Sequence, residues 1–308
     1  MISTISSNSR STIYAKNAVL KADIPKLSPR ATNGPEVTIV MPTFRRPNSV
    51  GTTIRTLLEG TWADFELLVR DDGDGEDGTR EAVAAAASGD SRVAYHHNSR
   101  NLRMPGNLNE GIKASRGNFI AVCHDHDLYK PRFIETMVTT LRRNPSALFV
   151  HCAVETLTDS GEVAETYVGD WGELTPGTAW LRRMLRSLSC PVCALTVVRR
   201  EAHERYGLYD LSCGFIADVE MWMRLSSYGD VAYVAEPLIQ VAAREEGHAE
   251  TENWDRWIKV AADIHRRFLP SAYEPRQRTV RSVLLELKFG NQYLRHHASR
   301  VLNRLGAN

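Results

Sequence analysis

Four consecutive side chains able to bind a divalent cation occur at His124, Asp125, His126 and Asp127. They follow directly after the apolar stretch 118–123, whose composition is typical of a buried β-strand. On an extended backbone, His124 and His126 would point to one side and the two carboxylates to the other. A cation held there would neutralise a diphosphate, and mixed nitrogen and oxygen ligands accept Mn²⁺ as well as Zn²⁺. A surface loop in which these residues cluster by chance is the alternative.

Two further groups of carboxylates stand where chemistry is expected. Asp71 and Asp72 end the apolar stretch 65–70 and precede Gly73, so they can accept hydrogen bonds from a base or a ribose. A polar loop explains this pair equally well, because Asp and Gly favour turns. Asp218 lies just ahead of the helical stretch 219–226. It can act as a general base, or as an N-cap that stabilises the helix by about 1 kcal/mol.

Alternating strands and helices are expected to position these residues. Strands are predicted near 37–41, 65–70, 92–96, 118–123, 147–154, 194–198 and 231–234, and helices near 50–58, 79–87, 107–115, 131–142, 178–188 and 219–226. This order predicts an α/β fold with a mostly parallel, doubly wound sheet flanked by helices. In such a sheet, ligands bind beyond the carboxyl ends of the strands. The polar groups after Met41, Arg70 and Cys123 fall at such ends.

The chain divides into three parts. Residues 1–34 are polar and are predicted to form a disordered or loosely attached arm, residues 35–248 the α/β domain, and residues 249–308 a helical extension. The segment 276–308 carries seven Lys and Arg against the single acid Glu286. Its apolar residues fall at helical spacing: Val280, Val283, Leu284 and Leu287. The stripe could lie on an anionic membrane surface, or it could pack on the domain or on a second subunit, and packing against protein is favoured.

Composition excludes several classes of protein. The 38 Lys and Arg residues balance 37 Asp and Glu, a formal net charge of +1, so no nucleic-acid partner is expected. No apolar run is long enough to cross a bilayer, and the start lacks the apolar core of a signal peptide. Five cysteines do not suggest a disulfide framework, and the Cys190–Cys193 pair is interpreted as buried thiols rather than a zinc or redox site. A cytoplasmic location is expected, at most peripheral to the inner face of the membrane.

Several short motifs follow one another in a characteristic order. They are Val37-Thr38-Ile39-Val40-Met41-Pro42-Thr43, Asp71-Asp72-Gly73, Arg116-Gly117-Asn118-Phe119-Ile120, His124-Asp125-His126-Asp127, Tyr206-Gly207-Leu208-Tyr209-Asp210, and Asp218 with Trp222-Met223-Arg224-Leu225. Through them the chain, from about Glu36 to Arg244, resembles the inverting family 2 glycosyltransferases of the GT-A (Rossmann-like) fold. Each motif is weak alone, and their order and spacing together are specific.

The resemblance implies a nucleotide-sugar donor, with UDP as the expected nucleotide. The loop at Pro42 and Thr43 would hold the base together with Asp72, which would accept from the pyrimidine ring. Arg103 lies where family members place a basic residue against the nucleotide. Asp125 would meet the ribose or the metal-bound diphosphate. The acceptor hydroxyl, on a glycan, a lipid-linked glycan or another molecule, is not indicated.

The resemblance also implies a divalent metal. His126 and Asp127, with Asp125, correspond to the metal-binding end of the family's DXD motif, and His248 is a weaker fourth candidate. The chain departs from the family by having His124 and His126 at usually acidic positions. Imidazole binds Mn²⁺ but lacks the negative charge that holds Mg²⁺, so Mn²⁺ is expected over Mg²⁺.

Asp218 matches the family's catalytic base, which would deprotonate the acceptor hydroxyl in a single inverting displacement. Two alternatives stay open from the residues. One is a nucleotide-sugar binding protein that has lost catalysis with its acidic metal ligands. The other is a metal-dependent hydrolase built on His124 to Asp127.

Overall fold

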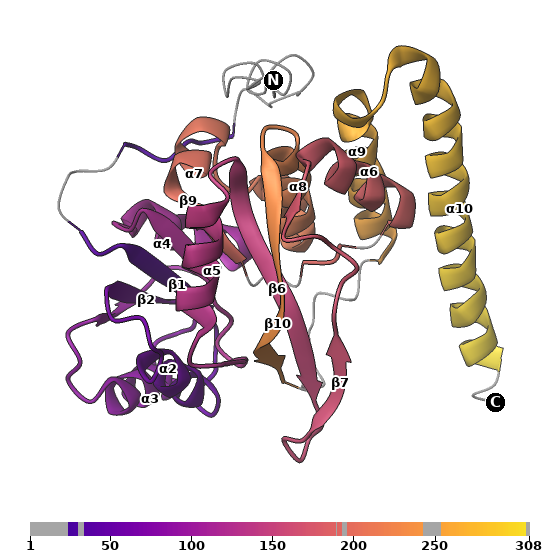
Figure 1. Cartoon of the computed structure of the whole chain (residues 1–308). Coiled ribbons are helices and arrows are strands. Elements are labelled where there is room, and N and C mark those ends of the chain that lie inside the picture. Colours follow the sequence, from indigo (N-terminus) through magenta and orange to yellow (C-terminus); the bar gives the residue numbers. More distant parts are fainter. Residues whose placement is uncertain (1–23, 30–33, 189, 193–195, 243–253, 306–308) are drawn as a thin grey trace, which may run out of the picture.

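One sheet with helices on both faces organises the protein (Figure 1). The computed structural model describes residues 24–29, 34–188, 190–192, 196–242 and 254–305. Within these residues the strands are β1 (Val37–Thr43), β2 (Phe65–Asp71), β3 (Val93–His97), β4 (Phe119–Val122), β5 (Leu128–Tyr129), β6 (Ala147–Leu157), β7 (Val163–Tyr167), β8 (Leu174–Thr175), β9 (Thr196–Arg199) and β10 (Asp230–Val241). Their order is β3-β2-β1-β4-β9-β6-β10-β5, with β7 beside β6 and β8 beside β10.

The sheet is mostly parallel in its central part, which confirms the predicted fold class. β3, β2, β1 and β4 are parallel neighbours, and β10 runs parallel to β6. β9 runs antiparallel to both β4 and β6 and so joins the two parallel groups. The remaining antiparallel strands, β5, β7 and β8, pair with β10 or β6. Strand-helix alternation alone predicted neither the direction of β9 nor these short strands.

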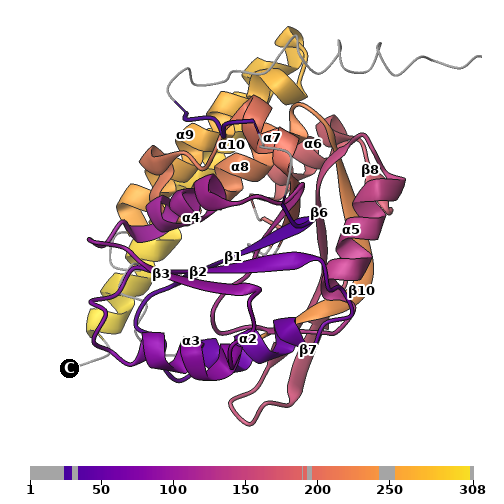
Figure 2. The same ribbon diagram turned by 90° about the vertical axis from the view of Figure 1, so that its left-hand side faces the viewer.

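Helices form layers on the two sides of the sheet (Figure 2). They are α2 (Val50–Leu58), α3 (Thr79–Ala87), α4 (Arg103–Ala114), α5 (Phe133–Arg143), α6 (Gly177–Ser187), α7 (Arg200–Tyr206), the 3₁₀ helix η1 (Leu211–Ile216), α8 (Ala217–Ser226), α9 (Trp254–Ala272) and α10 (Pro275–Leu305). In Figure 2, α2 and α3 lie on one side of β1–β3, and α4, α8 and α9 lie on the other.

Alternation along the strands feeds two separate cores. In β1, Ile39 and Met41 pack with α2, α3 and α5, whereas Val40 between them packs with α4, α6 and α8. In β6, Phe149 belongs to the core that contains Val40, and Val150 belongs to the core that contains Ile39 and Met41. Successive side chains of a strand point to opposite faces, so a continuous apolar run is what a sheet covered on both faces needs.

The C-terminal helices correct one expectation. The stripe of Val280, Val283, Leu284 and Leu287 does not pack on the domain, because these side chains are 42–64% exposed. Leu285 and Phe289, on another side of α10, are buried instead. None of the helices within the described residues is long and apolar enough to cross a membrane.

Candidate active site

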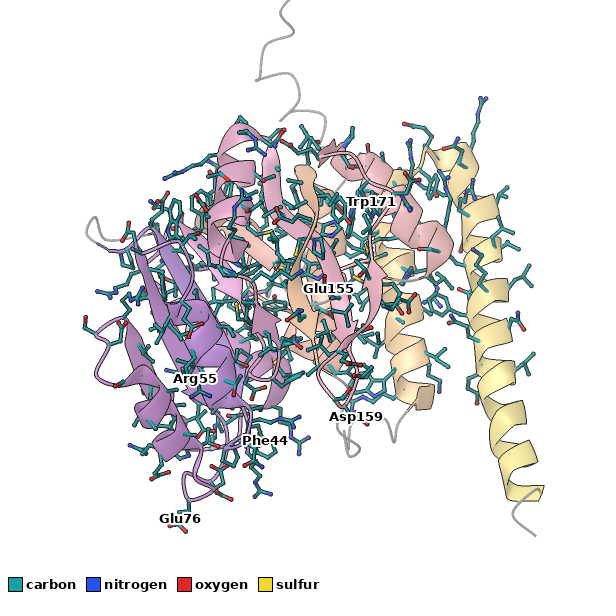
Figure 3. All side chains as sticks on the ribbon, turned by 60° about the horizontal axis from the view of Figure 1, so that its bottom comes forward. Phe44, Arg55, Glu76, Glu155, Asp159 and Trp171 are labelled. Carbon is teal, nitrogen blue, oxygen red and sulfur yellow. The ribbon has the colours of Figure 1, made fainter. Side chains whose placement is uncertain are left out.

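The polar groups singled out from the sequence follow neighbouring strands. β3, β2, β1 and β4 are adjacent and parallel, with Thr43 opposite Asp71 and Val40 opposite Val122. The segments that follow these strands therefore leave the sheet at one edge, as expected. Phe44, directly after β1, is exposed there (Figure 3) and carries the Arg45 guanidinium 5.3 Å from its ring centre.

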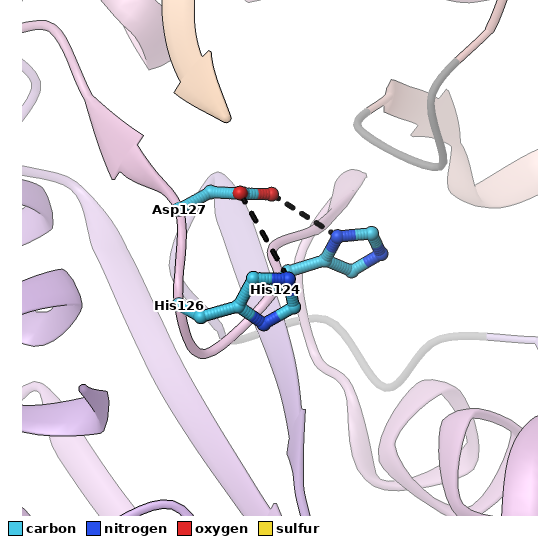
Figure 4. Close-up of side chains that lie close together, drawn as sticks. All are labelled: His124, His126 and Asp127. Atoms are coloured by element: carbon cyan, nitrogen blue, oxygen red, sulfur yellow. Dashed lines mark hydrogen bonds and ion pairs between the residues drawn. The ribbon is translucent and has the colours of Figure 1, made fainter. Parts of the chain in front are cut away.

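His124, His126 and Asp127 form a compact group in which one possible ligand atom of each lies within 4.8 Å of the others (Figure 4). His124 Nδ1 is 3.1 Å from Asp127 Oδ2, and the two imidazole rings stack at 5.4 Å. The segment turns after Cys123 instead of continuing as a strand. Asp127 therefore lies on the same side as both histidines, and the expected separation of imidazoles from this carboxylate was wrong.

Hydrogen bonds hold the loop that carries these residues. Asp127 is fully buried, its carboxylate accepts from the Ala242 backbone N–H at 3.2 Å, and its carbonyl accepts from Thr53 Oγ1 at 2.9 Å. Asp125 is also buried, with Oδ1 2.9 Å from His126 Nδ1. This hydrogen bond is the main reason why the pKa of His126 is raised above its usual value. A cation bound here would have to displace that proton.

Asp72 holds the chain that leads into α4. Its Oδ1 accepts from Asn98 Nδ2 at 2.9 Å and from the Leu102 N–H at 2.8 Å, and its Oδ2 accepts from the Arg103 N–H at 2.6 Å. Asn98 in turn bonds Arg70 and Asn107. Asp72 is 4% exposed, so three donors from one loop surround a buried carboxylate.

The other expected nucleotide contacts lie around Asp72. Thr43 accepts from the Asp72 N–H through its carbonyl at 2.9 Å, and its buried Oγ1 has no hydrogen-bond partner among the described residues. Pro42 precedes it and is half-buried. The Arg103 side chain is exposed, and its backbone is left-handed, with φ of 57°.

His124 and Asp218 line the same pocket. Its lining comes from α4, from the end of β4 and the loop after it, from η1 and the loop before it, and from the start of α8: Met104, Pro105, Leu108, Val122, His124, Tyr209, Gly214, Phe215, Ala217 and Asp218. The Arg103 N–H is bonded to Asp72, and the next residue, Met104, lines the pocket. The Asp72 loop therefore adjoins this pocket. The three polar groups predicted from distant parts of the sequence are thus brought into one region.

Asp218 lies in the first turn of α8, which the structure caps with Ile216 rather than with Asp218. The N-cap alternative was therefore wrong. Asp218 Oδ1 accepts from the Val219 N–H at 2.8 Å. Burial raises the pKa of Asp218 to about 6, opposed in part by the hydrogen bond from the Val219 N–H and by the nearby His124. A carboxylate with such a pKa is ionised at neutral pH and still basic enough to take a proton.

The pocket wall opposite is fixed by paired contacts. Asn109 of α4 donates to the Tyr209 carbonyl at 2.9 Å and accepts from its N–H at 3.0 Å. At Gly214, where φ is 57°, a Cβ atom would lie 2.4 Å from the Trp257 ring. Sequence reasoning did not assign Met104, Tyr209 or Phe215 to the pocket, although Tyr209 lies in one of the recognised motifs.

A buried ionic network supports α8. Glu220 and Arg224 are each 1% exposed and pair at 3.0 Å. Arg224 also donates to the carbonyls of Gly207 at 3.1 Å and Leu208 at 2.7 Å, and Arg267 of α9 reaches Glu220 at 3.2 Å. The network joins α8 to the segment that supplies Tyr209.

Most of the arm predicted over residues 1–34 lies outside the described residues, and so do two predicted features of the domain. His248, the weaker metal candidate, is one, and Cys193 of the Cys190–Cys193 pair is the other. Cys123, Cys152 and Cys213 are buried, whereas Cys190 is half-buried.

Comparison with known proteins gives consistent matches. The family model described as glycosyl transferase family 2 matches residues 38–207, more than half of the chain. A curated relative, the GalNAc(5)-diNAcBac-PP-undecaprenol beta-1,3-glucosyltransferase of Campylobacter jejuni, is 25% identical over 39% of this chain and 39% of its own length. The chain spans less than half the length of the first curated relatives it matches.

Solved structures share the fold. TarS of S. aureus, in complex with UDP-GlcNAc, superposes with a TM-score of 0.63 at 12% identity, covering 81% of this chain and 71% of that one. The mannosyltransferase PcManGT of Pyrobaculum calidifontis, in complex with GDP-Man and Mn²⁺, gives 0.55 at 15% identity, covering 97% and 81%. The layered α/β architecture described above is therefore one that glycosyltransferases use.

Proposed function

The chain belongs to glycosyl transferase family 2, and from this we propose that it transfers a sugar from a nucleoside-diphosphate donor to an acceptor hydroxyl with inversion. One observation carries the proposal. His124, from the candidate metal group, and Asp218, a carboxylate with a raised pKa, line the same pocket beyond the carboxyl ends of the strands. Such a pocket can hold a reactive carbon between a leaving group and a base.

The donor would bind along the edge of the sheet. Pro42 and Thr43 would contact the base, and the loop held by Asp72 would close over the nucleotide with Arg103 free to meet its phosphates. The unpartnered Oγ1 of Thr43 supports this assignment, since a buried hydroxyl without a partner is costly. UDP is our proposed nucleotide, as in the TarS complex.

The donor set fits a divalent metal. His124, His126 and Asp127 offer two imidazoles and one carboxylate within 4.8 Å, and Asp125 is hydrogen-bonded beside them. Mixed nitrogen and oxygen ligation favours Mn²⁺ over Mg²⁺, which prefers oxygen alone. When bound, the cation would neutralise charge that develops on the diphosphate.

Asp218 would perform the proton transfer. As the acceptor oxygen forms its bond to the anomeric carbon, its proton passes to the Asp218 carboxylate, and the bond to the diphosphate oxygen breaks with its electron pair. Arg103 would stabilise the leaving diphosphate more strongly in the transition state than in the ground state. Attack opposite the leaving group inverts the anomeric centre.

The acceptor is proposed to be a lipid-linked glycan. The name of the Campylobacter relative specifies an undecaprenol-diphosphate acceptor. We expect acceptor specificity to depend on two regions. One is the stretch 156–189, whose sequence pattern is less regular than that of the first half of the domain, and the other is the C-terminal helices.

A thermal-shift panel tests donor and metal binding together. We expect UDP and Mn²⁺ together to stabilise the protein more than either does alone. With Mn²⁺ present and UDP at one hundred times its dissociation constant, UDP should stabilise the folded state by about 2.7 kcal/mol. In the double variant His124→Ala/His126→Ala, the shift with UDP should be the same with Mn²⁺ as with chelator. His96→Ala, an exposed histidine near the same edge, is the matched control.

The same panel separates the alternatives. Absence of any shift with nucleotide diphosphates would contradict donor binding. A shift without metal-stimulated release of UDP from a UDP-sugar would favour a non-catalytic binding protein. Rapid hydrolysis of substrates that lack a nucleotide would favour the hydrolase.

The pH dependence of turnover gives an independent check. Below its pKa of about 6, Asp218 is protonated and cannot accept the acceptor proton. We therefore expect kcat, measured at saturating Mn²⁺ and donor, to fall about tenfold per pH unit below pH 6 and to level off above pH 7. A flat profile between pH 5 and pH 7 would argue against a base of this kind.

A further inference from the structure

One side of α10 is an apolar stripe that nothing in the described part of the chain covers. Val280, Val283, Leu284, Leu287 and Leu294 are 61%, 55%, 42%, 64% and 68% exposed. Their spacing places them on one face of the helix, and we call them the α10 stripe. The helix stands at the outer edge of the molecule (Figure 1). An exposed apolar face of this length marks an interaction surface.

A pocket opens next to this stripe, between α6, α9 and α10. It is lined by Leu185, Arg186, Leu269, Tyr273, Arg281, Leu284, Leu285 and Lys288. Leu284 belongs to both the pocket and the α10 stripe, so the two are continuous. The pocket combines an apolar lining with three cationic side chains.

The charges around this pocket are not balanced within the protein. Among the described residues, Arg186, Arg281 and Lys288 form no salt bridge, and Lys288 Nζ donates to the neutral backbone carbonyl of Arg186. The acid of α10, Glu286, is already bonded to Arg266 at 2.7 Å. The surface therefore attracts anions, although the chain as a whole carries a formal charge of only +1.

Tyr273 adds a second, independent observation. It is 6% exposed, lines the pocket, and its hydroxyl has no hydrogen-bond partner among the described residues. The Arg281 guanidinium lies 5.1 Å from its ring centre. A buried hydroxyl normally has a partner, and an anionic oxygen entering the pocket would supply one.

We propose that this surface docks the protein on a bilayer that contains anionic phospholipids. A lipid phosphate would enter the pocket and contact Arg186, Arg281, Lys288 and the Tyr273 hydroxyl. The α10 stripe would lie in the boundary between headgroups and acyl chains. Apolar residues flanked by cations are what an interfacial helix requires.

Charge and polarity favour this occupant over two others. In a dimer formed by two α10 stripes, Arg281 and Lys288 would face residues of the same sign, which is destabilising. A nucleic acid would use the cations but would leave the apolar stripe exposed to water. The proposal does not depend on the sugar-transfer reaction, because vesicle binding is measured without substrates.

Co-flotation of the full chain with vesicles tests the proposal. We expect binding to phosphatidylcholine vesicles that contain phosphatidylglycerol and little binding to phosphatidylcholine alone. Arg281→Glu/Lys288→Glu should lower the partition coefficient at least about 25-fold, since each cation near an anionic surface contributes roughly fivefold. Arg132→Glu/Arg205→Glu, with the same change in net charge on other exposed surfaces, should change it less than about twofold.

Apolar variants test the α10 stripe separately. Val283→Gln/Leu287→Gln should weaken vesicle binding at least about tenfold, because two partly inserted side chains become polar. Val163→Gln/Val168→Gln, exposed at and just after β7, should have no effect. Tyr273→Phe should lower the preference for anionic vesicles by about fivefold.

Three results would overturn the proposal. They are equal binding to neutral and anionic vesicles, charge reversal at Arg281 and Lys288 without effect, and a self-associated protein that the stripe variant converts to monomer without any vesicle binding. The last result, seen by sedimentation velocity, would assign the α10 stripe to a second copy of the chain.

Discussion

Replacing Asp218 with Asn should lower kcat about 10²–10⁴-fold, the range of general-base assistance. The amide has nearly the same shape but cannot accept the acceptor proton. Because Pro42, Thr43 and Arg103, which we assign to the nucleotide, are not among the residues that line the pocket with Asp218, the affinity for the UDP-sugar should change less than about threefold. Single-turnover transfer and donor binding by calorimetry measure the two quantities separately.

The variant also changes the pH profile if the role is correct. The loss of activity below pH 6 should disappear from the residual reaction of Asp218→Asn, since no carboxylate is left to titrate at that position. Asp90→Asn, at a surface ion pair with Arg92, should leave both kcat and the profile unchanged. Normal turnover by Asp218→Asn would exclude this residue as the base and leave the family assignment intact.

The fold could be predicted because successive side chains of its central strands pack into two different cores. Val37 to Met41 is buried at every position and apolar at all but Thr38, as a strand covered on both faces requires, and the polar residues after β1, β2 and β4 then had to share one edge. The helix predicted over 79–87 has the bounds that the structure gives to α3. Each of these inferences depends on local periodicity.

Features that depend on tertiary contacts could not be predicted in this way. β9 runs antiparallel because it fits between β4 and β6, and nothing in Thr196–Arg199 encodes that direction. All five residues of β7 are exposed, so its pattern contains no buried face to detect. The α10 stripe looked like a core-facing surface, because periodicity does not reveal what covers a helix.

The site shows the same division. Residue types identified His124 to Asp127 as a ligand group, but the turn that brings Asp127 beside both histidines depends on Thr53 and on the Ala242 N–H. The three donors around Asp72 lie 26 to 31 residues further along the chain. Strand ends can be located from sequence, whereas the hydrogen bonds between the loops that follow them cannot.

The buried Glu220–Arg224 pair ties α8, which carries Asp218, to the segment before Tyr209. Replacing Arg224 with Met should lower the free energy of unfolding by about 3–5 kcal/mol, the usual cost of removing one partner of a buried ion pair. The carbonyls of Gly207 and Leu208 lose their donor as well, and Glu220 keeps only Arg267. Urea unfolding followed by circular dichroism measures the change. Arg205→Met, at an exposed pair with Glu201, should cost less than about 1 kcal/mol.

A second substitution distinguishes a stranded charge from lost packing. If the uncompensated carboxylate causes most of the loss, Glu220→Gln/Arg224→Met should be more stable than Arg224→Met alone, because the buried negative charge is gone. If the double variant is as unstable as the single one, the lost hydrogen bonds to the segment before Tyr209 dominate. Either result tests the pocket, since Tyr209 and Asp218 both depend on this network for their positions. An Arg224→Met protein with unchanged stability would contradict the structural role assigned to the pair.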